Sequence, residues 1–132
     1  MSGLSVLIAD DETPITSILR NRLEKVGCSV RVAHDGQEAF ELASADAPDV
    51  VVTDLQMPRW TGLEFALAMA GDDRLSGVPV LLLTARGYIV APEQQEKTNI
   101  RAVISKPFSA NEVVRTVLNM VGSNGIVRKE SA

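Results

Sequence analysis

Five polar side chains follow apolar runs of this chain and could together bind a phosphoryl group and a metal ion. They are Asp10, Asp11, Asp54, Thr84 and Lys106. Three carboxylates at one site repel one another and cost stability unless a cation neutralises them. Mg²⁺ typically takes one or two carboxylates together with phosphate oxygens, and an ammonium and a hydroxyl suit the remaining oxygens. A carboxylate among such groups is suited to act as the nucleophile in phosphoryl transfer.

Each of these residues also has an ordinary structural interpretation. Acids ahead of Pro14 favour the positive end of a helix, and an aspartate after a strand is a common turn former. A lone lysine–proline pair is usually part of a surface turn. Any one residue alone favours the ordinary interpretation, whereas the set of five favours a shared site.

Whether these five residues lie close together depends on the secondary structure of the segments around them. Short apolar runs alternate five times with segments of helical period. Four runs are almost continuously apolar, as expected of parallel strands covered on both faces. Arg31 interrupts the other run, which predicts an edge strand. The runs are residues 6–8, 30–32, 50–52, 80–83 and 103–104.

Helix signals agree with this alternation. Pro14 suits a first helical position, and residues 61–64 and 109–112 have the pattern of a capping box. Gly27 is predicted to end the first helix. The fourth helix is predicted to be short and to start near Pro92.

Such alternation predicts an α/β fold with a parallel sheet, right-handed crossovers and helices on both faces. In open sheets of this kind, ligands bind outside the carboxyl ends of the strands, where the winding reverses. Each of the five polar residues directly follows an apolar run or lies within two residues of one. We therefore expect all five at one edge of the sheet.

Composition limits the possible functions. The chain has 132 residues and a net charge of -4, which fits one domain and disfavours direct nucleic-acid binding. A single cysteine, Cys28, cannot form an internal disulfide and suits a reducing cytosol. The start of the chain lacks a signal sequence, and the apolar runs are too short for membrane insertion. We expect a cytoplasmic protein with one domain over residues 1–122 and a flexible tail over residues 123–132.

The chain resembles the receiver domain of bacterial two-component response regulators. Five motifs match in order and spacing, and the resemblance covers residues 4–121. The matching stretches are residues 6–12, 54–58, 62–64, 83–85 and 106–108. The resemblance implies a CheY-like, flavodoxin-like fold, in which a doubly wound five-stranded parallel sheet of order 2-1-3-4-5 is flanked by five helices.

The resemblance also implies a metal site. Asp54 would attack the phosphorus of a phosphohistidine on a sensor histidine kinase or phosphotransfer protein. Asp11, Asp54 and the backbone carbonyl of Gln56 would bind Mg²⁺ directly, and Asp10 would act mainly through a metal-bound water. The side chains of Gln56 and Arg86 occupy positions that in this family tune the phosphoryl lifetime, although two solvated side chains are an equal alternative.

The phosphoryl oxygens would be held by Thr84, by the backbone amide of Ala85 and by Lys106. The resemblance further implies a cis peptide bond before Pro107. This chain departs from the family at one position of the output face. Receivers commonly carry an aromatic residue there, and its ring turns inward on activation. Val103 occupies that position here, which excludes an aromatic rotamer switch.

Three functions are open on the sequence. The favoured one is a single-domain response regulator that signals by binding an unknown downstream protein and catalyses only its own phosphorylation and dephosphorylation. The second is a binding module that phosphorylation does not regulate. The third is an enzyme for small phosphate esters, which would need a second acid where Leu55 and Gln56 stand. Outside the site, we interpret His34 as a surface residue and Trp60 as a packing residue or kinase contact.

Overall fold

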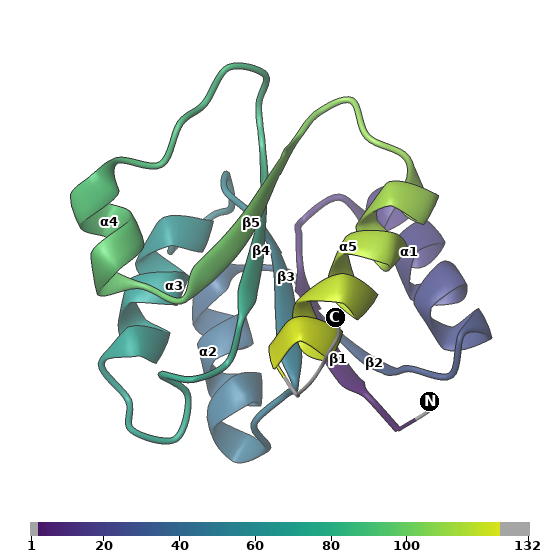
Figure 1. The fold of residues 1–132 in the computed structure, drawn as a ribbon, viewed down its shortest axis with the longest axis horizontal. Coiled ribbons are helices and arrows are strands. Elements are labelled where there is room, and N and C mark those ends of the chain that lie inside the picture. The colour runs from purple at the N-terminus through teal and green to yellow at the C-terminus, as the bar shows by residue number, and fades with distance from the viewer. Residues whose placement is uncertain (1–2, 125–132) are drawn as a thin grey trace.

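Five strands and five helices alternate along the chain (Figure 1). A computed structural model describes residues 3–124, with side chains to residue 121. The strands are β1 (Ser5–Ala9), β2 (Ser29–Ala33), β3 (Val50–Asp54), β4 (Val80–Thr84) and β5 (Ile100–Ser105). The helices are α1 (Thr13–Lys25), α2 (Gly36–Ala45), α3 (Gly62–Ala70), α4 (Pro92–Lys97) and α5 (Ala110–Asn124). The predicted α/β alternation is confirmed.

The strands form one parallel sheet in the order β2-β1-β3-β4-β5, which confirms the expected topology. The winding reverses between β1 and β3, so the carboxyl ends of these two strands form the ligand-binding switch point of an open sheet. β2 is an edge strand, as the interruption of its apolar run by Arg31 indicated. The Arg31 guanidinium donates hydrogen bonds to the carbonyl oxygens of Leu42 at 3.0 Å and Asp46 at 2.6 Å, near the end of α2.

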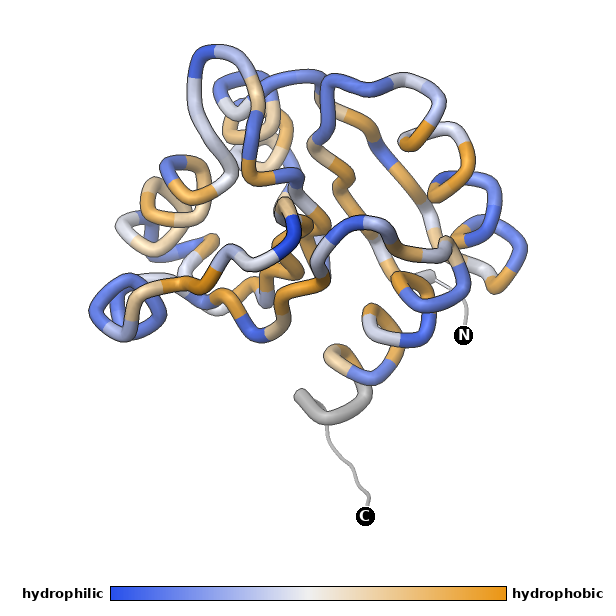
Figure 2. Tube along the Cα trace, turned by 90° about the horizontal axis from the view of Figure 1, so that it is seen from above, coloured by the Kyte–Doolittle hydropathy of each residue, from blue (hydrophilic) through white to orange (hydrophobic). Residues whose placement is uncertain are grey.

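Helices cover both faces of the sheet. Figure 1 shows α1 and α5 on one face and α2, α3 and α4 on the other. Successive strand residues point to opposite faces, so Leu7 belongs to the apolar cluster beneath α2 and α3, while Ile8 belongs to the cluster beneath α1 and α5. Figure 2 shows the apolar strands inside and polar residues on the outer turns.

Local signals explain most of the helix ends. Pro14 lies in the first turn of α1, and Gly27 follows that helix with a φ of 96°. Thr61 and Glu64 form the predicted capping box of α3, with hydrogen bonds of 3.1 and 2.8 Å between each side chain and the other residue's amide. α4 begins at Pro92, as expected, and none of its residues is buried.

The last helix extends further than the sequence pattern indicated. α5 spans Ala110–Asn124, so residues 123 and 124, the first two of the predicted tail, are helical. Most of the predicted tail, residues 125–132, lies outside the described residues, so its flexibility stays a prediction. Between residues 3 and 124, no helix is long and apolar enough to cross a membrane.

Candidate phosphoryl-accepting site

Asp54 is the last residue of β3, a strand in which every residue is buried. The amide of the next residue, Leu55, donates to the carbonyl of Leu83 at 2.9 Å. This bond continues the sheet pairing past Asp54 and fixes its backbone at the carboxyl edge. Burial raises the pKa of the Asp54 carboxyl, and the hydrogen bond and charge of Lys106 oppose that rise.

Asp10 and Asp11 follow β1 at the same edge. Carboxylate oxygens of Asp10, Asp11 and Asp54 all lie within 4.8 Å of one another. Asp10 is fully buried; its Oδ1 accepts a hydrogen bond from the amide of Glu12 at 2.9 Å. Among the described residues, its Oδ2 has no hydrogen-bond partner. Burial raises the pKa of Asp10 to about 6, against the lowering effect of the Glu12 amide.

Lys106 reaches this cluster from the end of β5. Its Nζ lies 3.1 Å from Asp54 Oδ1 and 3.6 Å from Glu12 Oε1. Its amide donates to the Thr84 carbonyl at 2.8 Å, which ties the ends of β4 and β5 together. Burial lowers the pKa of Lys106, but the bond to Asp54 outweighs that effect and raises it. The peptide bond to Pro107 is cis, as the resemblance implied.

Thr84 ends β4, the strand next to β3. Because Asp54 pairs in register with Leu83, Thr84 lies one position beyond Asp54 on the neighbouring strand. Its Oγ1 is buried and has no hydrogen-bond partner among the described residues. A buried hydroxyl without a partner costs about 1–3 kcal/mol. This cost is recovered if an incoming oxygen atom, such as one of a phosphoryl group, accepts its hydrogen bond.

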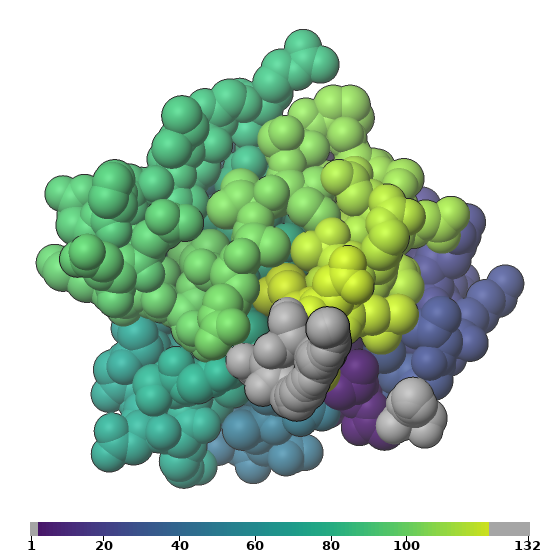
Figure 3. All heavy atoms as spheres, in the orientation of Figure 1, coloured from purple at the N-terminus to yellow at the C-terminus, as the bar shows by residue number. Residues whose placement is uncertain are grey.

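A pocket of about 420 Å³ opens at these strand ends. Figure 3 shows the segment after β4 projecting at the same end of the molecule as the segment that links β5 to α5. Arg86 is exposed and does not line the pocket, whereas Gln56 does. The lining residues are Asp11, Glu12, Asp54, Gln56, Met57, Pro58 and Lys106.

The structure therefore brings the five predicted residues to one edge of the sheet. Sequence reasoning gave no role to Glu12, although its position directly after two aspartates was a usable signal. Gly62, the first residue of α3, also belongs to the site. A Cβ atom at this position would lie 2.3 Å from the carbonyl oxygen of Asp54, so only glycine fits there.

If Asp54 accepts a phosphoryl group, as the resemblance implies, Gly62→Ala is expected to slow that reaction at least roughly tenfold, because a displaced carboxylate loses its alignment. The substitution should also destabilise the domain by about 1–3 kcal/mol, as overpacking does. Gly77→Ala is the matched control, since nothing lies within 4 Å of a Cβ there. Mass spectrometry after incubation with acetyl phosphate measures the rate; equal rates in the two variants would contradict this account.

A doubly wound sheet with acids, a hydroxyl and a lysine at its switch point is the architecture of a signalling receiver. Comparison with known families agrees, because the model of the response regulator receiver domain matches residues 6–118. The chain belongs to this family, whose members take part in two-component signal transduction.

Individual relatives show the same relationship. Response regulator MprA of Mycobacterium bovis strain BCG is 36% identical over 114 residues, which are 85% of this chain and 48% of MprA. The chain thus spans about half the length of this relative. A putative response regulator from Chloroflexus aurantiacus has a TM-score of 0.81 at 28% identity, covering 91% of this chain and 98% of its own. CheY4 of Vibrio cholerae has a TM-score of 0.77 at 29% identity, covering 91% and 99%.

Proposed function

We propose that this receiver accepts a phosphoryl group on Asp54 from a sensor histidine kinase or phosphotransfer protein and then signals by binding a downstream protein. The observation that carries the proposal is the 3.1 Å contact between Lys106 Nζ and Asp54 Oδ1. This contact lies at an open pocket, and on the neighbouring strand Thr84 has a buried hydroxyl without a hydrogen-bond partner among the described residues. A structural ion pair alone would explain neither the pocket nor the unpaired hydroxyl.

The reaction exchanges one phosphorus bond for another. An Asp54 carboxylate oxygen bonds to phosphorus while the bond from phosphorus to the donor histidine nitrogen breaks, and the freed imidazole keeps the electron pair. Lys106 and Thr84 donate hydrogen bonds to the phosphoryl oxygens, which develop charge that fixed donors stabilise. The product is an acyl phosphate on Asp54; attack of water on phosphorus breaks the bond to the Asp54 oxygen, releases inorganic phosphate and returns the carboxylate.

The carboxylates suit Mg²⁺, which prefers oxygen ligands. Asp10 Oδ2 is buried without a hydrogen-bond partner within residues 3–121, and three acids approach one another, so both features would be stabilised by a nearby positive charge. Asp10, Asp11, Asp54 and the backbone carbonyl of Gln56 would hold the ion. When bound, Mg²⁺ would supply positive charge to the acids and to the phosphoryl oxygens.

Phosphorylation would change the charge of the site by about -1.5 to -2. Lys106, which contacts both Asp54 and Glu12, would be drawn to the new oxygens. The protein would act on no separate substrate and would catalyse only the phosphorylation and dephosphorylation of its own aspartate. A cytoplasmic location and a downstream protein partner stay predictions from the sequence.

Incubation with acetyl phosphate and Mg²⁺ tests the proposal. The wild-type protein is expected to gain the mass of one phosphoryl group, and Asp54→Asn is expected to gain none, because an amide is no nucleophile for phosphorus. Asp49→Asn is the matched control, since Asp49 is an exposed acid at the opposite edge that accepts from the Ser5 amide. A gain that survives in Asp54→Asn, or no gain in the wild type with either acetyl phosphate or a phosphorylated kinase, would refute the proposal.

A further inference from the structure

The loop between β3 and α3, residues 55–61, is closed at its base. The Gly62 amide donates to the carbonyl of Leu55 at 2.8 Å, and Gly62 packs against the carbonyl of Asp54. The base therefore holds the two ends of the loop together. It leaves the outer part of the loop, which follows Gln56, to be fixed by other contacts.

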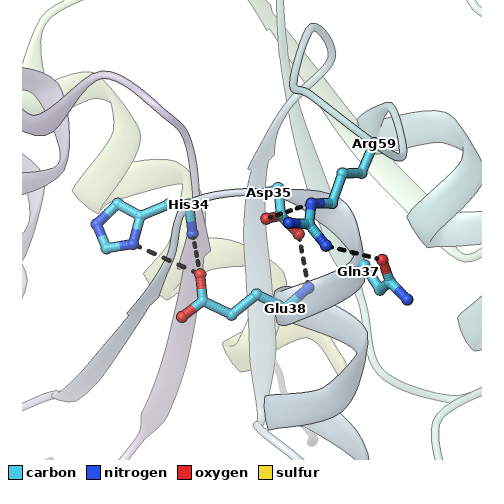
Figure 4. Close-up of polar contacts among 5 residues, drawn as sticks. All are labelled: His34, Asp35, Gln37, Glu38 and Arg59. Atoms are coloured by element: carbon cyan, nitrogen blue, oxygen red, sulfur yellow. Dashed lines mark hydrogen bonds and ion pairs between the residues drawn. The ribbon is translucent and has the colours of Figure 1, made fainter.

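Arg59 lies in this outer part and has a φ of 69°. A residue with a side chain rarely adopts this left-handed conformation and keeps it only where the surroundings enforce it. Its Nε lies 3.5 Å from Asp35 Oδ2, and its guanidinium donates to Gln37 Oε1 at 3.4 Å (Figure 4). The side chain of Arg59 is 66% exposed, so this ion pair contributes little by itself.

Trp60 makes the closer contact with α2. A Cβ atom at Gly36, the first residue of α2, would lie 2.5 Å from Trp60 Cβ and 2.6 Å from the Trp60 carbonyl oxygen. The indole also packs against Phe40 one turn later, with ring centroids 5.7 Å apart and planes tilted by 56°. The backbones of α2 and the loop therefore touch at a point where only glycine fits.

The N-terminus of α2 is itself fixed by a side-chain cap. Asp35 caps the helix, because its Oδ1 accepts from the Glu38 amide at 2.7 Å while its Oδ2 faces Arg59 (Figure 4). The same carboxylate thus fixes the first turn of α2 and contacts the loop. The contacts of Arg59 and Trp60 described above come from the cap and the first two turns of α2, while Met57, earlier in the loop, is buried in the apolar cluster.

We propose that the first turn of α2 positions the β3–α3 loop for metal binding, with Gly36 and Trp60 as positioning residues. This inference rests on the proposed function, because it assumes that the Gln56 carbonyl and the Asp54 carboxylate bind Mg²⁺. Gln56 lies in the sequence between the fixed base and the Trp60 contact, and we expect a backbone shift at Trp60 to pass through this short loop to its carbonyl. Gly36 and Trp60 touch neither the metal nor the phosphoryl group and act through the loop.

Thermal unfolding of Gly36→Ala with increasing Mg²⁺ tests this inference. The melting temperature without Mg²⁺ measures any structural damage, and its increase with Mg²⁺ measures binding to the folded state. The Mg²⁺ dissociation constant is expected to rise roughly tenfold, which is usual when a group that orients a metal ligand is lost. Gly77→Ala is expected to bind Mg²⁺ as the wild type does, because its Cβ meets nothing within 4 Å.

Trp60→Ala provides a second variant that adds no clash and keeps the space at Gly36. It removes the contact with Phe40 and is expected to weaken Mg²⁺ binding in the same direction. Wild-type Mg²⁺ binding in both Gly36→Ala and Trp60→Ala would overturn the positioning role, even if both variants melt at lower temperatures. A wild-type protein that Mg²⁺ does not stabilise would instead overturn the metal site of the proposed function, and this inference with it.

Discussion

Lys106→Met is expected to lower the rate at which acetyl phosphate phosphorylates Asp54 roughly a hundredfold. Lys106 Nζ lies 3.1 Å from Asp54 Oδ1 and is the single cation among the described residues that line the pocket. Removing one donor that faces developing charge typically costs roughly 10²–10³-fold in rate. Methionine keeps much of the length of the side chain, so the change is mainly one of charge. The initial rate of phosphorylation at fixed Mg²⁺, followed by mass spectrometry, gives the measurement.

Lys97→Met controls for the loss of one positive charge, because Lys97 is an exposed residue of α4. Lys106→Arg separates charge from shape, since a planar guanidinium does not replace a compact ammonium at a fitted site. We expect intermediate rates for this variant. Similar rates in Lys106→Met and Lys97→Met would show that the contact with Asp54 is structural and takes no part in the transfer.

Asp10→Asn is expected to stabilise the protein in the absence of Mg²⁺, by an amount that depends on pH. Burial raises the pKa of Asp10 from 3.8 to about 6, so the folded state holds this proton more tightly than the unfolded chain. Below pH 3.8 the Asp10 carboxyl is protonated in both the folded and the unfolded state, so its burial carries no charge penalty. Between the two values stability falls as pH rises, and above about 6 the full penalty applies. Its size is about 3 kcal/mol.

Asparagine carries no charge, so the variant avoids this penalty at neutral pH. Urea unfolding of both proteins across this pH range, in the presence of a chelator, measures the difference in free energy of unfolding. That difference should increase from about pH 4 to about pH 6 and then stay constant. Saturating Mg²⁺ should reduce it or reverse its sign, because the cation stabilises the Asp10 carboxylate. A difference that does not vary with pH would contradict the assigned burial effect.

The position of the site was predictable from the sequence because parallel strands end at a common edge. Asp10 and Asp54 each follow a continuous apolar run, and such runs identify buried strands without knowledge of tertiary contacts. Lys106 follows the last run in the same way. The strand order came from the resemblance to receivers, since the alternation of elements alone does not determine it.

Contacts between loops were not predictable in the same way. Gly36 and Trp60 are far apart in the sequence, and neither belongs to a periodic pattern, so nothing indicated that they touch. Trp60, interpreted as a packing residue or a kinase contact, packs against Phe40, and the kinase contact stays a prediction. His34 is more than half exposed, as expected, and its Nδ1 lies 3.5 Å from Glu38 Oε1 (Figure 4).

The helix without a buried residue, α4, has a consequence for how a signal could leave the pocket. Burial of apolar surface contributes about 25 cal/mol per Å², so an element that buries little is displaced at little cost. A single hydrogen bond gained by Thr84, the last residue before the segment that leads to α4, is worth about 1 kcal/mol. A free energy of that size changes the ratio of two arrangements about fivefold, so we expect α4, which has no buried residue, to change position in response to so small an input.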